Sequence, residues 1–75
     1  MFEKRKIRIS IKECENNIKA LEQKRSRSQS ALVQAILEHR DPDEEDVKYF
    51  NKYTKEINDI RARLHELNDE LKTLN

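Results

Sequence analysis

The stretch "HRDPDEED", residues 39–46, holds the only proline of a 75-residue chain that contains no glycine. His39 and Arg40 are cations suited to the negative C-terminal end of a helix, whereas Pro42 is tolerated at the first position of a new helix. Proline also disfavours helical geometry at Asp41, which can act as the N-cap of the helix that follows. The stretch therefore predicts that one helix ends here and another begins at once.

The residues after this stretch have the clearest periodicity of the chain. Apolar residues recur at alternating spacings of three and four, the heptad pattern of a helix that packs along one face. We expect a helix over about residues 43–74, with a seam formed by Phe50, Tyr53, Ile57, Ile60, Leu64, Leu67, Leu71 and Leu74.

The residues before the stretch carry a second heptad seam, which predicts a helix over about residues 3–40. This seam is apolar at both ends and polar in the middle, where Arg25 and Ser28 interrupt it. A polar residue at such a position can fix the register of a coiled coil at some cost in stability. The other seam residues are Ile7, Ile11, Cys14, Ile18, Leu21, Leu32 and Ala35.

If the chain reverses at a turn over about residues 41–42, the two seams face each other. A pairing centred on the proline places Ile11 opposite Leu74 and Ala35 opposite Phe50, so that small and large residues alternate across the seam. The same pairing leaves the first eight residues extending past the end of the second helix.

We therefore predict a single all-α domain over residues 1–75, folded as an antiparallel two-helix coiled-coil hairpin. The alternative is one continuous helix through Pro42, and an interior proline would cost that helix about 3 kcal/mol.

Near the turn the chain is more apolar than one hairpin requires. Five residues outside the two seams form the predicted partner-binding site: Val33, Ile36, Leu37, Val47 and Tyr49. Exposed apolar patches of this kind mark interaction surfaces. They favour either binding of a larger protein partner or self-association into a homodimer that forms a four-helix bundle at this end. The two interpretations are compatible.

Charge is distributed unevenly along the chain. Residues 1–40 hold ten lysines and arginines against five acids, whereas residues 41–75 hold six against ten. Four cations near the N-terminus form a predicted basic anchor for an acidic partner: Lys4, Arg5, Lys6 and Arg8. The alternative is an ordinary solvated chain end.

Several kinds of chemistry are not expected. Without glycine there is no phosphate-binding loop, and the acids of residues 41–46 lack the glycine of a calcium loop. His39 and His65 lie far apart along the predicted rod, and Cys14 is a seam residue with no disulfide partner. We expect no enzyme activity, cofactor, metal or small-molecule ligand. No apolar run suits a membrane span or signal peptide, which favours a soluble, cytoplasmic protein.

The hairpin pattern resembles several classes of small helical protein. These are plasmid copy-control bundles, export co-chaperones of needle-type secretion, Rho-binding antiparallel fingers, and host-takeover proteins of bacteriophages. The chain lacks the glycine and the basic motif of the Rho-binding fingers, and no functional residue is assigned from these likenesses.

We expect an interaction protein: a small regulator, inhibitor or adaptor, with a phage or mobile element as a candidate source. The alternatives are a nucleic-acid-associated bundle that uses the cations of the first helix, which the near-neutral composition disfavours, and an assembly or export co-chaperone.

Overall fold

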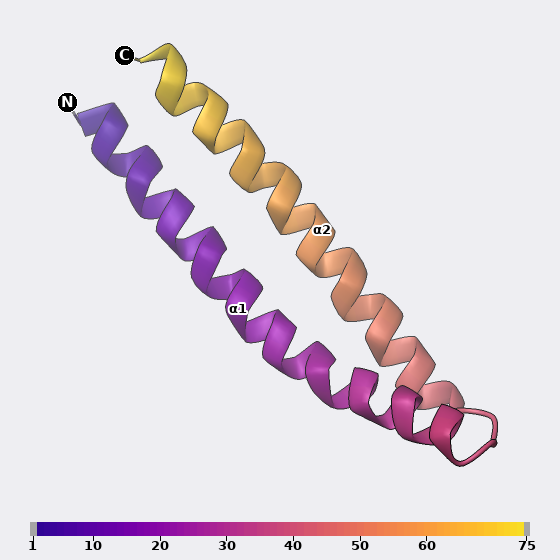
Figure 1. Ribbon diagram of the computed structural model, residues 1–75. Coiled ribbons are helices and arrows are strands. Elements are labelled where there is room, and N and C mark those ends of the chain that lie inside the picture. The colour runs from indigo at the N-terminus through magenta and orange to yellow at the C-terminus, as the bar shows by residue number, and fades with distance from the viewer. Residues whose placement is uncertain (1, 75) are drawn as a thin grey trace.

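The computed structural model describes residues 2–74 and consists of two long helices joined by one short connection. Helix α1 spans Phe2–Leu37 and helix α2 spans Glu44–Thr73. Figure 1 shows them side by side in antiparallel directions along their whole length, with both chain ends at one extremity of the rod. The rod measures 56 × 16 × 15 Å, and no strand occurs in its described residues. The predicted all-α helical hairpin is confirmed.

Helix α1 ends in a Schellman motif, although the chain has no glycine to occupy its left-handed position. His39 takes that position with φ of 56°. Its backbone N–H donates to the carbonyl of Ile36 (3.1 Å), and the N–H of Arg40 donates to the carbonyl of Ala35 (3.0 Å). These two hydrogen bonds satisfy carbonyls that the last helical turn would otherwise leave unpaired. The helix therefore ends at Leu37, before the predicted end at residue 40.

Helix α2 starts later than the sequence indicated. Asp43, in extended conformation, is the N-cap residue, and its carbonyl accepts the first helical hydrogen bond from the N–H of Val47 at 3.2 Å. The prediction that Asp41 caps the helix and that Pro42 is its first residue is wrong. The reversal instead uses Asp41, Pro42 and Asp43 as a non-helical link, because the Schellman motif has already occupied the residues before them.

A small charged network stiffens this reversal. Arg40 Nε donates a hydrogen bond to Glu38 Oε2 at 2.7 Å, and Gln34 Nε2 donates one to Glu38 Oε1 at 2.8 Å. Both bonds lower the pKa of the Glu38 carboxyl from its ordinary value of 4.5, and the bond from Arg40 has the larger effect. The ionised Glu38 carboxylate therefore stabilises the fold at pH values above its ordinary pKa. This stabilisation is lost as the pH falls through the lowered pKa that Glu38 has in the folded protein. Because both side chains are exposed, solvent keeps this contribution small.

The core is the seam that the heptad pattern predicted. Ala35 and Ile57 are completely buried, and Ile18, Leu67 and Ser28 are also buried. The remaining seam residues of both helices are half-buried, apart from Leu74 at the chain end, which is exposed. A two-helix rod can bury only one stripe of each helix, which explains why so few side chains are fully removed from water.

The register differs from the predicted one by about one turn at the open end and about two turns at Arg25. Ile7 and Leu74 line the same groove at the open end, so the N-terminal residues do not extend past α2. Further along, Arg25 lies over the Phe50 ring, 5.8 Å from its centroid, and its Nη1 contacts Thr54 Oγ1 at 3.4 Å, rather than lying opposite Ile60.

The physical reason for this shift is the position of the turn. The midpoint between the last residue of α1, Leu37, and the first of α2, Glu44, lies two residues before the assumed centre. Moving the centre by two residues moves each facing pair by four residues, about one turn, which accounts for Ile7 and Leu74 and for about half of the displacement at Arg25. A heptad seam tolerates that shift, because apolar residues recur every three or four positions.

The left-handed residue yields a first prediction. Replacing His39 by glycine removes the steric cost of positive φ, so His39→Gly should stabilise the hairpin by about 0.5–1 kcal/mol in urea unfolding. The matched control is the other histidine, which lies inside α2. His65→Gly should destabilise by about 0.5 kcal/mol, because glycine is less favourable than histidine inside a helix. Equal destabilisation by both substitutions would contradict the Schellman geometry.

A second prediction concerns the core. Ile57→Ala removes a completely buried side chain and should lower the free energy of unfolding by about 2–5 kcal/mol, because it leaves a cavity that the rod cannot fully close. Ile9, which is half exposed on α1, provides the matched control, and Ile9→Ala should change stability by about 0.5 kcal/mol or less. Similar losses for the two variants, measured by circular dichroism in urea, would show that the seam is placed incorrectly.

Candidate functional site

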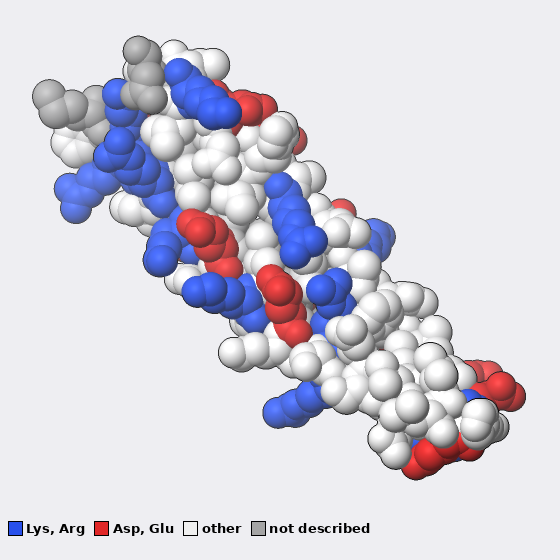
Figure 2. All heavy atoms as spheres, in the orientation of Figure 1, with Lys and Arg blue, Asp and Glu red and all other residues white. Residues whose placement is uncertain are grey.

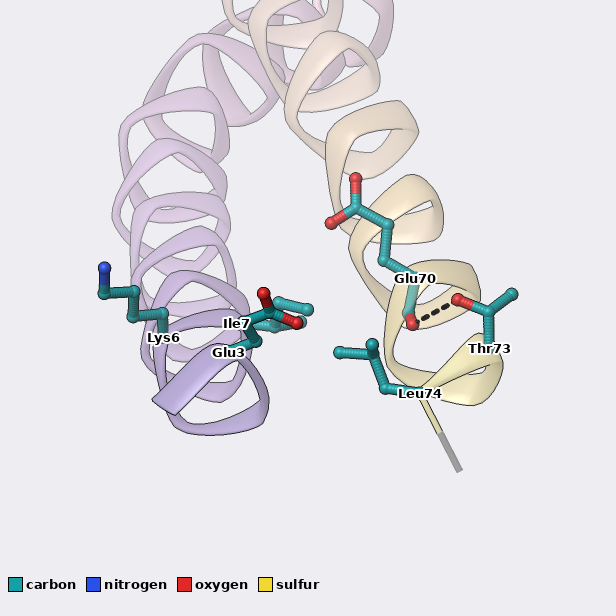
Figure 3. Close-up of a pocket in the computed structure, with 6 residues that line it drawn as sticks. All are labelled: Glu3, Lys6, Ile7, Glu70, Thr73 and Leu74. Carbon is teal, nitrogen blue, oxygen red and sulfur yellow. Dashed lines mark hydrogen bonds between the residues drawn. The ribbon is translucent and has the colours of Figure 1, made fainter. Parts of the chain in front are cut away.

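The hollows of this rod are surface grooves. One lies at the open end between the start of α1 and the end of α2, with a volume of about 360 Å³. In Figure 3, Ile7 and Leu74 point toward each other from the two helices, and the Thr73 hydroxyl donates to the backbone carbonyl of Glu70 at 2.7 Å. Glu3 and Lys6 complete the lining. The groove is the last, loosely closed layer of the seam, and it contains no nucleophile paired with a base.

The described residues contain neither a cluster of metal-ligating side chains nor a disulfide. No group of three or more His, Cys, Asp or Glu side chains between residues 2 and 74 is placed to hold a metal ion. Cys14 is a free thiol, half-buried in the seam of α1. The features that remain are surfaces, and two of them are the surfaces that the sequence singled out.

The basic anchor lies on the first turns of α1, beside the end of α2. Arg5, Lys6 and Arg8 are exposed, and Lys4 is half-buried. Figure 2 shows positive charge crowded at this open end of the rod and negative charge at the opposite tip. The acids at the tip belong to the link and the first turn of α2: Asp41, Asp43, Glu44, Glu45 and Asp46. The molecule is therefore a rod whose two ends differ in charge.

The five residues of the predicted partner-binding site are all exposed, as a contact surface requires. Their exposed fractions are 48% for Val33, 70% for Ile36, 69% for Leu37, 37% for Val47 and 44% for Tyr49. All five lie in the part of the rod nearest the turn. We call them the turn-end cluster.

The turn-end cluster does not form one flat patch. Val47 and Tyr49 are two residues apart in α2, which places them about 200° apart around the helix, on opposite sides of the hairpin. Tyr49 instead stacks on Tyr53, with ring centroids 6.1 Å apart and planes inclined by 20°. Leu37 is likewise about 200° from the buried Ala35, so it lies on the back of α1.

Three members of the cluster, Val33, Ile36 and Val47, belong to a larger surface that the sequence interpretation missed. On each helix, four uncharged residues at spacings of three and four run beside the seam. We call this surface the neutral face: Ser26, Gln29, Val33 and Ile36 on α1, with Val47, Asn51, Thr54 and Asn58 on α2.

Helical geometry places both rows on the same side of the hairpin. Ile36 lies about 100° past the buried Ala35, and Val47 lies about 80° past the buried Ile57 in the same sense. Each rotation is measured about the helix's own axis, in the direction of increasing residue number. Because the two helices run in opposite directions, similar rotations away from the line of contact bring residues of both helices to the same side of the hairpin. Figure 2 views this side: its half nearer the turn is almost free of charge, whereas charges crowd the half nearer the chain ends.

A signal for the neutral face was present in the sequence. Eight uncharged residues at heptad spacing form a second seam in a chain that is 41% charged. Five of the eight are polar, however, so a search for apolar residues alone passes over them.

The chain was compared with known protein families, curated proteins and solved structures. No family model, curated protein or solved structure matches this chain. Neither helix has, within the residues described, an apolar stretch of the length needed to span a bilayer.

Proposed function

We propose that this protein is a non-enzymatic interaction module, a small regulator, inhibitor or adaptor that acts by occupying a surface of a larger protein. The observation that carries the proposal is the turn-end cluster: of the eight large apolar side chains that are exposed in the described residues, five lie in the part of the rod nearest the turn. A few residues carry most of the binding energy at protein interfaces, and tyrosine is one of the types enriched among them, while surrounding contacts exclude water. Tyr49 suits the first role and its apolar neighbours suit the second.

Local contacts restrain the backbone and one aromatic ring of the cluster. The Schellman motif and the contact between Glu38 and Arg40 fix the end of α1, and the stacked rings of Tyr49 and Tyr53 fix one side of α2. A surface ordered before binding loses less conformational entropy when the partner arrives. This favours the turn end over the open end, where the seam is only loosely closed.

In this proposal the basic anchor has a supporting role. Its cations lie at the far end of a 56 Å rod, so they steer or orient an acidic partner rather than form the centre of the contact. Binding of nucleic acid through α1 remains the second candidate, since phosphate groups would meet the same cations. Acids on the same helix, among them Glu3, Glu13 and Glu15, oppose that use.

Two members of the cluster that lie outside the neutral face provide the test. The double variant Leu37→Glu, Tyr49→Glu places charge on the cluster at exposed helical sites, so the fold should persist. Wild-type protein immobilised on beads should capture a larger partner from its native host. The purified partner should then bind the double variant at least about ten-fold more weakly, because apolar anchors are lost.

The matched control uses apolar residues near the open end. Phe2 and Ile9 are 80% and 51% exposed, so Phe2→Glu with Ile9→Glu makes the same chemical change far from the cluster. This control should bind the partner as the wild type does. Equal binding by all three proteins, with helix content unchanged by circular dichroism, would exclude the cluster as the site. A steep loss of a nucleic-acid complex with added salt would favour the second candidate.

A further inference from the structure

We infer that the neutral face is the docking surface for a second copy of this chain, bound antiparallel to the first. The inference deepens the proposed function by identifying one partner, and it leaves Leu37 and Tyr49 free for another. It rests on the charge pattern along a single side of the hairpin.

The neutral face suits contact with its own copy. A two-fold interface brings the same patch of both chains together, so any charge near its centre meets a like charge. The eight residues of the neutral face carry no charge of their own, and Val33, Ile36 and Val47 supply apolar area. The nearest cation is Arg25, whose guanidinium contacts Thr54 in the open-end half of the face. The serine, threonine, glutamine and asparagine side chains around them can hydrogen-bond across a two-fold axis, because each is both donor and acceptor.

The charges that flank the neutral face determine the orientation. Toward the tip lie the acids of the turn, among them Asp43 and Glu44. Toward the open end, helical spacing places Lys19, Arg25 and Arg61 on the same side as the neutral face, against the single acid Glu22. The guanidinium of Arg25 is already directed to this side, since it contacts Thr54, a residue of the neutral face. We call Lys19, Arg25 and Arg61 the cation belt.

An antiparallel copy brings these charges together favourably. The acidic turn on one side of the neutral face, and Lys19 and Arg61 on the other, each lie about 14 Å from its centre at 1.5 Å per residue, and Arg25 lies nearer to the centre. Reversing one copy about the centre therefore places each acidic turn on the other copy's cation belt. A parallel copy would instead place one acidic turn against the other, and like charges would oppose the contact.

The size of the contact indicates a weak dimer. An overlap of about 30 Å across a rod 16 Å wide covers roughly 500 Å² on each copy. The total of about 1,000 Å² lies at the lower limit for a specific interface. Dimerisation should therefore depend on concentration and, through the turn and the cation belt, on salt.

Sedimentation velocity of the full chain over a range of concentrations tests the inference. Wild-type protein should shift from monomer to dimer as its concentration rises. Ile36→Glu, in the neutral face, should weaken the dimer at least ten-fold, because each copy would bury an unpaired carboxylate in the contact. Tyr49→Glu is the matched control on the opposite side and should dimerise as the wild type does. A wild type that stays monomeric, or equal weakening by both variants, would overturn the inference.

A single spin label at Glu44, with Cys14 changed to serine, tests the orientation. Two labels in an antiparallel dimer should lie about 30 Å apart, because each sits about 14 Å from the centre. Labels in close contact would indicate the parallel arrangement and overturn this part of the inference.

The outcomes separate this inference from the proposed function. A monomeric protein that still captures a larger partner through Leu37 and Tyr49 would overturn the dimer and leave the interaction function standing. A protein that dimerises but captures no larger partner would support the dimer and contradict the proposed function.

Discussion

The structure depends on one reversal of the backbone, made without glycine. His39 takes a left-handed conformation that glycine usually fills, and two backbone hydrogen bonds close the end of α1 around it. Because this geometry is costly for a residue with a side chain, it persists only where its surroundings fix it. The two backbone hydrogen bonds and the restriction that Pro42 places on Asp41 provide that support, and the exposed contact between Glu38 and Arg40 adds a small contribution. Everything along the rod follows from where this reversal falls.

The position of the reversal sets the register, and the register sets which side chains meet. The link between Leu37 and Glu44 aligns Ile7 with Leu74 at the open end and brings Arg25 to Phe50 and Thr54. A guanidinium over an aromatic ring lets a charged residue occupy the seam without being fully removed from water. The polar middle of α1 is thereby accommodated, and Arg25 is left directed toward the neutral face.

Much of this fold could be predicted from residue spacing, because heptad periodicity reports directly which side of a helix is buried. The seams from Ile7 to Ala35 and from Phe50 to Leu71 lie where the pattern placed them. The register could not be predicted in the same way, since a shift of one turn returns apolar residues to apolar residues. The end of α1 was also missed, because a histidine in left-handed conformation has no sequence signature comparable to glycine.

The candidate surfaces could likewise be predicted from the sequence only in part. The apolar members of the turn-end cluster could be named because apolar residues off a seam are conspicuous. Their placement on different sides of the hairpin required the helices to be aligned: Tyr49 lies opposite Val47, and Leu37 lies on the back of α1. The neutral face depends mainly on uncharged polar residues such as Gln29 and Asn51, whose meaning emerges only when both helices are seen to present them on one side.

The most direct test of this account is a distance between the two ends of the chain. Spin labels at Arg8 and Lys72, in a chain with Cys14 changed to serine and diluted into unlabelled protein, report the separation within one molecule. The hairpin predicts about 25 Å or less, since packed helix axes lie about 8–10 Å apart and each label adds its own length. One continuous helix would place the labels about 100 Å apart, at 1.5 Å per residue, and that result would contradict the reversal at His39.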